Sequence, residues 1–131
     1  MKSKVILCLL LVSSFSFFSC SSDDSPSNSN AQFENKWWYS PDNSTLDILF
    51  NSDGTYESVY VFQGTTMNSD GEWEWINESA KTFRVFNLGG NAVSEYYGKA
   101  TNLTDDSVGI KLSMDEGATY SEPYTYVDTN N

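Results

Sequence analysis

From residue 33 onward, the sequence repeats one pattern that few folds can accommodate. Short apolar or aromatic stretches are separated by clusters of Gly, Asn, Asp and Ser at intervals of roughly 8 to 15 residues. Within several stretches large apolar side chains occupy every second position, as Val108, Ile110 and Leu112 do. Successive side chains of a strand point to opposite faces, so this period of two predicts strands with one buried and one solvated face. Because no segment has a convincing helical periodicity, the predicted fold class is all-β.

The spacing of these stretches predicts eight strands. We expect them at residues 36–40, 45–51, 55–62, 71–76, 81–87, 92–101, 107–113 and 119–127. Strands that follow one another without intervening helices form an antiparallel meander, and eight of them can close into an up-and-down barrel that leaves no unpaired edge. We therefore predict an eight-stranded antiparallel barrel over residues 33–131, with a two-sheet sandwich as the alternative.

One short pattern occurs twice, at residues 51–57 and 68–74, and each copy carries Asp-Gly before an aromatic strand. Asp-Gly favours tight hairpins, because Gly accepts a positive φ and Asp tolerates it. We therefore expect turns at Asp53-Gly54 and at Asp70-Gly71. A pair of calcium loops is the alternative, but neither copy supplies the ligand positions of an EF-hand loop, and we predict no metal site.

The first 19 residues have the pattern of a secretion signal. Lys2 and Lys4 precede an apolar run at 5–12, and serines interrupt the run before it is long enough to span a bilayer. Residues 17–20 resemble the cleavage box of bacterial lipoproteins, which ends at the cysteine that becomes lipidated, here Cys20. Cys8, the only other cysteine, lies in the removed segment, so Cys20 has no partner for an intramolecular disulfide. An ordinary signal peptide that leaves Cys20 as a free thiol is the alternative.

Residues 20–32 contain no large apolar side chain after Cys20 and predict a flexible tether. Within them, Ser22, Asp23 and Asp24 resemble the acidic export signal of lipoproteins in Bacteroidetes-type bacteria. The resemblance implies an outer-membrane protein, held by lipid on Cys20 and facing the cell exterior. A solvated acidic linker that carries no export signal is the alternative.

The charge balance excludes several classes of function. The chain has 18 acidic residues, 7 basic residues and no histidine, giving a formal net charge of −11. Nucleic-acid phosphates would repel such a chain, and His-based triads or metal sites are impossible. Glu72 and Glu74 share a strand face and could form an acid/base pair, but they alternate with tryptophans and belong on the solvated side. We expect no catalytic residue, no cofactor and no enzyme activity.

Two motifs resemble those of the lipocalin-like domains found in small Bacteroidetes lipoproteins. Asn35-Lys36-Trp37 matches the Gly-x-Trp motif with Asn in place of Gly, so Trp37 takes the motif position. Thr104-Asp105 matches the start of the Thr-Asp-Tyr motif between the sixth and seventh strands. The late arginine and the C-terminal helix of lipocalins have no counterpart. The resemblance covers residues 35–127 and implies a barrel that binds rather than catalyses.

Aromatic side chains dominate the predicted barrel, since of the 20 Phe, Tyr and Trp residues only Phe15, Phe17 and Phe18 precede it. An eight-stranded barrel holds either its own side chains or one small ligand, and rings on most strands favour a mostly filled interior with at best a shallow site at one mouth. The candidate mouth residues are Trp38, Tyr39, Tyr96 and Tyr97. The predicted function is non-catalytic binding of a small apolar molecule or glycan, and the alternative is a packed barrel that acts in protein–protein interaction or as a structural envelope protein.

Overall fold

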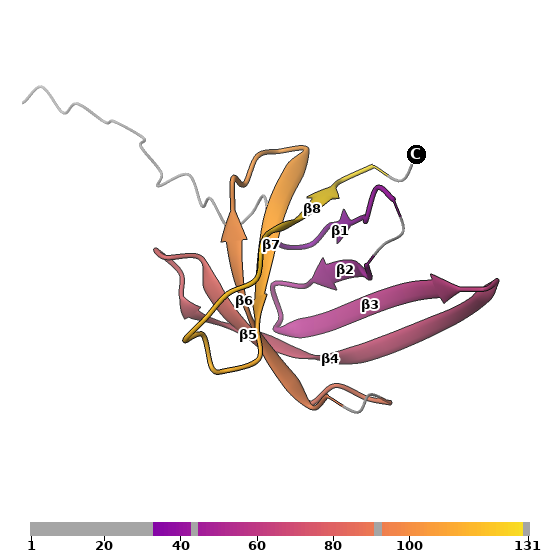
Figure 1. Ribbon diagram of the computed structural model, residues 1–131, viewed down its shortest axis with the longest axis horizontal. Coiled ribbons are helices and arrows are strands. Elements are labelled where there is room, and N and C mark those ends of the chain that lie inside the picture. Colours follow the sequence, from indigo (N-terminus) through magenta and orange to yellow (C-terminus); the bar gives the residue numbers. More distant parts are fainter. Residues whose placement is uncertain (1–32, 43–44, 91–92, 130–131) are drawn as a thin grey trace, which may run out of the picture.

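The computed structural model describes residues 33–42, 45–90 and 93–129, which form eight strands in one antiparallel sheet in chain order (Figure 1). The pairing of Tyr39 with Val127 brings the first and last strands together through two backbone hydrogen bonds, of 2.7 and 3.0 Å. The prediction of an all-β, up-and-down barrel is confirmed. Its strands are β1 (Trp37–Trp38), β2 (Asp47–Phe50), β3 (Thr55–Phe62), β4 (Thr65–Asn77), β5 (Thr82–Phe86), β6 (Glu95–Thr101), β7 (Ser107–Ser113) and β8 (Tyr124–Val127).

The predicted bounds are correct for β3 and β7 and wrong at one end or both for the other strands. The expected last strand at 119–127 begins only at Tyr124, directly after Pro123, which has no backbone N–H to donate to a ladder. The predicted lipidation site Cys20, the export residues Ser22, Asp23 and Asp24, and the boundary at residue 20 lie outside the described residues.

The Asp53-Gly54 turn is confirmed. Gly54 has a φ of 87° and donates its N–H to the Asn51 carbonyl at 3.0 Å. The Asp53 carboxylate accepts hydrogen bonds from the Thr55 hydroxyl at 2.7 Å and the Thr55 N–H at 2.9 Å, which lower the pKa of Asp53. The Asp53 carboxylate therefore stabilises the turn through hydrogen bonds within the loop.

The prediction of a turn at Asp70-Gly71 is wrong. Both residues lie inside β4, where Asp70 pairs with Glu57 and Gly71 with Tyr56. A Cβ on Gly71 would lie 2.8 Å from the Phe86 carbonyl oxygen, so the glycine permits the close approach of β5 rather than a reversal of the chain. The hairpin instead turns at Gln63 and Gly64, whose φ angles of 50° and 79° have the sign of a type I′ turn.

The long β3–β4 hairpin extends beyond the rest of the barrel (Figure 1). The β2 ladder on β3 ends at Val59, and the β5 ladder on β4 begins at Glu72, so residues 60–62 and 65–67 form ladder pairs only with each other. Val61, Phe62 and Met67 are exposed on this projection.

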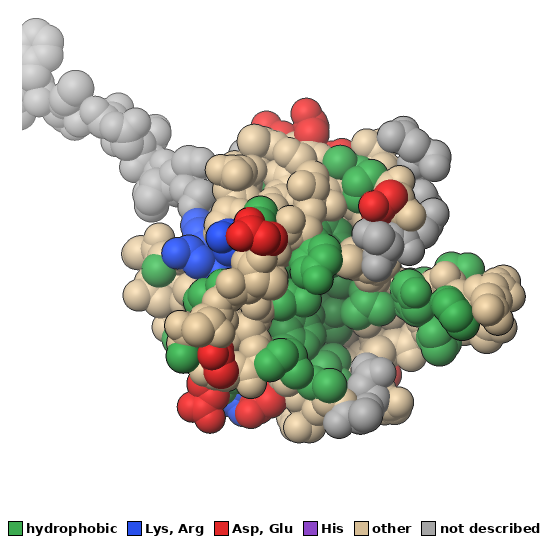
Figure 2. All heavy atoms as spheres, in the orientation of Figure 1, with side chains coloured by type: hydrophobic (Ala, Val, Ile, Leu, Met, Phe, Trp, Pro, Cys, Tyr) green, Lys and Arg blue, Asp and Glu red, His purple; other side chains and the backbone are tan. Residues whose placement is uncertain are grey.

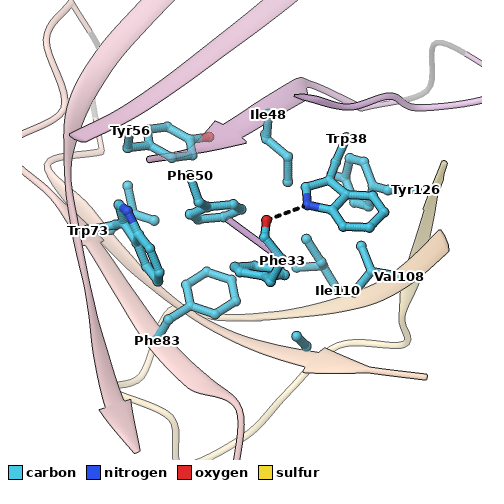
Figure 3. Packing of buried hydrophobic residues seen from close by; sticks show 12 residues of the cluster. Phe33, Trp38, Ile48, Phe50, Tyr56, Trp73, Phe83, Val108, Ile110 and Tyr126 are labelled. Atoms are coloured by element: carbon cyan, nitrogen blue, oxygen red, sulfur yellow. Dashed lines mark hydrogen bonds between the residues drawn. The ribbon is translucent and has the colours of Figure 1, made fainter. Parts of the chain in front are cut away.

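Aromatic rings fill one end of the barrel, which we call the closed end. Phe33, which precedes β1, enters the barrel there, and its ring centroid lies 4.6 Å from Phe50, 5.7 Å from Phe83 and 6.0 Å from Trp73 (Figure 3). The Phe33 carbonyl accepts a 2.8 Å hydrogen bond from the Trp38 indole N–H. The fully or nearly fully buried cluster comprises Phe33, Trp38, Ile48, Phe50, Tyr56, Trp73, Phe83, Val85, Ala100, Val108, Ile110 and Tyr126.

Candidate functional site

The opposite end of the barrel, which we call the open end, contains a cavity of about 370 Å³. Figure 2 shows hydrophobic side chains gathered around a hollow in the middle of the molecule. The expectation of a filled barrel is therefore correct for the closed end and wrong for the open end. The described residues that line the cavity, none of them charged, are Thr45, Leu46, Ile48, Phe50, Tyr60, Val93, Tyr96, Ile110, Leu112, Met114, Tyr124 and Tyr126.

The period of two within the strands aims most of these side chains inward. Ile48 and Phe50 come from β2, while Ile110 and Leu112 come from β7. Their neighbours in the chain face out, as Lys111 does between the two β7 residues. Phe50 belongs to both ends, since it lines the cavity and also stacks on Phe33. The ring cluster thus forms the floor of the cavity.

Three tyrosines of the core lie close together beside this floor. Burial raises the pKa of Tyr56, raises that of Tyr96 well above the usual value, and raises that of Tyr126 to about 12. All three phenols therefore stay protonated at neutral pH and can donate as well as accept a hydrogen bond. The side chains of Tyr96 and Ser58 are near enough to offset part of the rise in the Tyr56 pKa, but neither forms a hydrogen bond of acceptable geometry with the Tyr56 hydroxyl, which has no such partner among the described residues.

Of the four predicted mouth residues, only Tyr96 lines the cavity. Trp38 is fully buried at the closed end, where the ammonium of Lys36 lies 4.3 Å from the centroid of its ring. Tyr97 follows Tyr96 on β6 and therefore faces out, where it pairs across the ladder with Arg84 of β5. The prediction that Trp38 and Tyr97 lie at a mouth is wrong for two reasons. Alternation does not reveal how deep in the barrel Trp38 lies, and Tyr97 cannot share the inner face with its neighbour Tyr96.

Tyr39 also faces out and not into the barrel. Its ring stacks on that of Trp37 at a centroid distance of 6.5 Å, and both line a depression of about 170 Å³ on the outer surface together with Asp47 and Val59. The Trp37 side chain, which the lipocalin-like motif singles out, is thus outside the barrel, and its neighbour Trp38 is the buried one. The small outer depression is a distinct feature from the cavity.

The other motif residues lie near the closed end of the barrel. Asn35, at the position of the motif glycine, has a φ of 60°, a conformation that Asn adopts more readily than most residues. Thr104 and Asp105 follow β6, as predicted, and the Thr104 hydroxyl accepts a 3.0 Å hydrogen bond from the Ser107 N–H. Lys36 donates to the Asp105 carbonyl, which links the start of β1 to this loop.

Glu72 and Glu74 are exposed on the outer face, as their alternation with tryptophans predicts. Glu72 accepts a 2.8 Å hydrogen bond from the Asn87 amide, and Glu74 lies 3.6 Å from the Arg84 guanidinium. Arg84 in turn donates to Glu95 at 2.9 Å through its Nε. These carboxylates thus have polar partners on the outer surface, and neither lines the cavity.

Several cavity residues are absent from the predicted site. Leu46, Val93 and Met114 line the mouth from segments that lie outside the observed strands. Tyr60 and Tyr124 lie on strands, but their height depends on the register. Two of them could have been found: Leu46 lies in the predicted strand 45–51 and has the same alternation as Ile48 and Phe50, and Met114 directly follows the predicted strand 107–113.

Comparisons with known proteins identify no family for this chain. No protein-family model matches it, and no curated protein matches it at a significant level. No helix long and apolar enough to cross a membrane occurs at residues 33–42, 45–90 or 93–129. Within the same ranges, no three His, Cys, Asp or Glu side chains form a group that could hold a metal ion.

Proposed function

We propose that this domain binds a small, predominantly apolar molecule in the open-end cavity and does not act as an enzyme. The observation that supports this is the cavity itself, about 370 Å³ in volume and lined by uncharged side chains. Ligand sites commonly have volumes of roughly 300 to 1,000 Å³ and mostly apolar walls with a few polar groups. The volume is at the lower end of that range and favours one small ligand over a large lipid.

The affinity that such a site can reach is limited. Each buried methylene contributes about 0.8 kcal/mol, so a ten-carbon ligand gains at most about 8 kcal/mol, equivalent to a dissociation constant of about 1 μM. The ligand also loses conformational, translational and rotational freedom on binding, and this entropy loss weakens the affinity further. We therefore expect micromolar or weaker binding.

We further propose that the protein is an outer-membrane lipoprotein anchored through Cys20, with Ser22, Asp23 and Asp24 directing it to the cell exterior. The apolar run at 5–12 and the small residue before Cys20 support this proposal. Phe33 enters the barrel at the closed end, so the cavity mouth is at the end opposite to the one that the chain enters. A Cys20→Ala variant should leave the membrane fraction and lose fatty-acid label, and persistence of both would contradict the anchor.

The cavity proposal can be tested with N-phenyl-1-naphthylamine, an uncharged apolar dye whose fluorescence rises in apolar surroundings. The dye should bind the wild-type protein at micromolar concentration. A Leu112→Trp variant narrows the cavity from β7 and should weaken dye binding at least tenfold, whereas Lys111→Trp adds the same ring to the outer face of that strand and should not. No saturable dye binding by the folded wild-type protein would refute the proposal.

A second candidate function is docking to another envelope protein through the β3–β4 hairpin. The side chains of Val61, Phe62 and Met67 favour it, because they are apolar and exposed on a projecting hairpin. Exposed apolar patches of this kind are typical of protein–protein interaction sites. A Val61→Glu variant separates the two functions, because Phe62 stacks on the cavity residue Tyr60 and Val61 alternates with both. It should leave dye binding unchanged if the cavity is the site, and it should abolish binding to the partner protein if the hairpin is the docking surface.

A further inference from the structure

The buried Tyr56 hydroxyl is the one polar side-chain atom in the described part of the chain that is both enclosed and without a hydrogen-bond partner. Such a group has lost its water and gained no partner, which costs stability. Folded proteins contain only a few such groups, so this hydroxyl calls for an explanation. A ligand that supplies the missing hydrogen bond is a reason for its presence.

The surroundings of Tyr56 connect this hydroxyl to the cavity. Its ring centroid lies 5.4 Å from Phe50 and 6.3 Å from Tyr96, and both of these residues line the cavity. Figure 3 shows the Tyr56 oxygen directed toward the side of Ile48, a third lining residue. Tyr56 itself does not line the cavity, and its hydroxyl is enclosed beside three residues that do.

No cation among the described residues faces the cavity. Lys99 and Lys111 alternate with inward residues and lie on the outer faces of β6 and β7. Arg84 lies outside with Glu95, while Lys36 and Lys81 lie over Trp38 and Trp75 of the ring cluster at 4.3 and 5.5 Å. A carboxylate in the cavity would have no counter-ion, so its burial is strongly disfavoured.

We propose that the cavity selects a molecule that is apolar over most of its surface and carries one uncharged hydrogen-bonding group, such as an alcohol or a ketone, which binds to the hydroxyls of Tyr56 and Tyr96. This inference rests on the proposed function, because it names the class of ligand for the same cavity. The two phenols remain protonated at neutral pH, since burial raises both pKa values. They can therefore donate to a ketone, and donate to or accept from an alcohol.

The experiment uses displacement of N-phenyl-1-naphthylamine by two probes of equal chain length, 1-decanol and decanoate, at pH 7. We expect 1-decanol to displace the dye at a concentration at least tenfold lower than decanoate does. Because any apolar cavity without a cation favours the alcohol, this ratio tests only the absence of a counter-ion. The Tyr hydroxyls are tested by variants.

Tyr56→Phe and Tyr96→Phe each remove one hydroxyl and leave the ring. We expect each to weaken 1-decanol binding about 3- to 10-fold, which corresponds to one neutral hydrogen bond, and to change dye binding little. The matched control is Tyr97→Phe, the adjacent outward-facing tyrosine of β6, which should change neither. Tyr56→Phe should also leave the melting temperature unchanged or raise it, because it removes an unpartnered group, so weaker binding by this variant would not reflect a loss of stability.

The outcomes distinguish this inference from the proposed function. If the dye binds but 1-decanol binds the two variants as tightly as the wild type, the tyrosine anchor is refuted and the cavity remains a binding site. If decanoate competes as well as 1-decanol, the preference for an uncharged group is refuted. Failure of dye and probes alike to bind the wild-type protein refutes both proposals.

Discussion

The two ends of this barrel are built from the same strands with the same alternation, yet one is filled and the other is hollow. At the closed end Phe33, Phe50 and Phe83 are fully buried, whereas at the open end Leu46 is 38% exposed and Met114 is 70% exposed. The difference arises largely from Phe33, which belongs to no strand and enters the barrel from before β1. One end of this barrel is thus closed by Phe33, a side chain from outside the sheet.

The ends also differ in how their polar tips are satisfied. At the closed end the indole N–H groups of Trp38, Trp73 and Trp75 donate to the Phe33 carbonyl, the Asn51 carbonyl and the Glu34 carboxylate, at 2.8, 2.8 and 3.1 Å. At the border of the open end the Tyr56 hydroxyl has no partner within the described residues. The buried indole N–H groups at the closed end all have protein acceptors, and this end needs no ligand. The hydroxyl without a partner lies beside the end where we propose that a ligand binds.

Among the variants that test this difference between the two ends, removal of the Phe33 ring should cause the largest loss of stability. Phe33→Ala leaves a cavity amid five aromatic neighbours and should lower the free energy of unfolding by about 3 to 5 kcal/mol, as measured by urea denaturation. A loss below about 1 kcal/mol would show that Phe33 does not close the barrel.

A methyl group at Gly98 should have the next largest effect. Gly98 of β6 lies under the Phe83 ring, and a Cβ there would overlap three of its carbon atoms. Gly98→Ala should therefore cost about 1 to 3 kcal/mol in thermal or urea unfolding. In a Phe83→Leu background the same change should cost less, because the smaller side chain can yield, and strict additivity of the two changes would contradict this contact.

Truncation at the open end should be nearly neutral. Leu46→Ala removes a half-exposed side chain from the rim of an existing hollow, so we expect a loss below about 1 kcal/mol in urea unfolding. The same variant should weaken dye binding. A loss as large as that of Phe33→Ala would mean that the open end is packed in solution.

Acidification should have the smallest effect and should act on the loop that follows β7 at the open end. Hydrogen bonds from Ser113 and Thr119 lower the pKa of Asp115 to about 2. Because the folded-state pKa is below the ordinary value of 3.8, the stabilisation is present above about pH 4 and is lost as the pH falls toward 2. The melting temperature of the wild type should exceed that of Asp115→Asn at pH 5, and the difference should shrink by pH 2. A difference that stays constant would contradict the role of the carboxylate.

The sequence was sufficient for the fold because alternation and turn residues are local properties. The period of two correctly assigned Ile110 and Leu112 to the inside, and Gly54 correctly marked a turn. The turn prediction from local sequence failed at Gly71. A glycine is needed there because the Phe86 backbone of a neighbouring strand approaches closely, and the local sequence does not show that contact. The cavity could not be predicted, because the number of aromatic residues does not reveal how far along the barrel their rings gather.

The proposed ligand site lies at the open end of the barrel and not at the closed end. Intermolecular nuclear Overhauser effects between 1-decanol and the protein measure this directly. We predict contacts from the alkyl chain to the methyl groups of Ile48, Ile110 and Leu112, and none to the rings of Phe33 and Phe83. Contacts confined to the β3–β4 hairpin, or their complete absence at saturating 1-decanol, would contradict it.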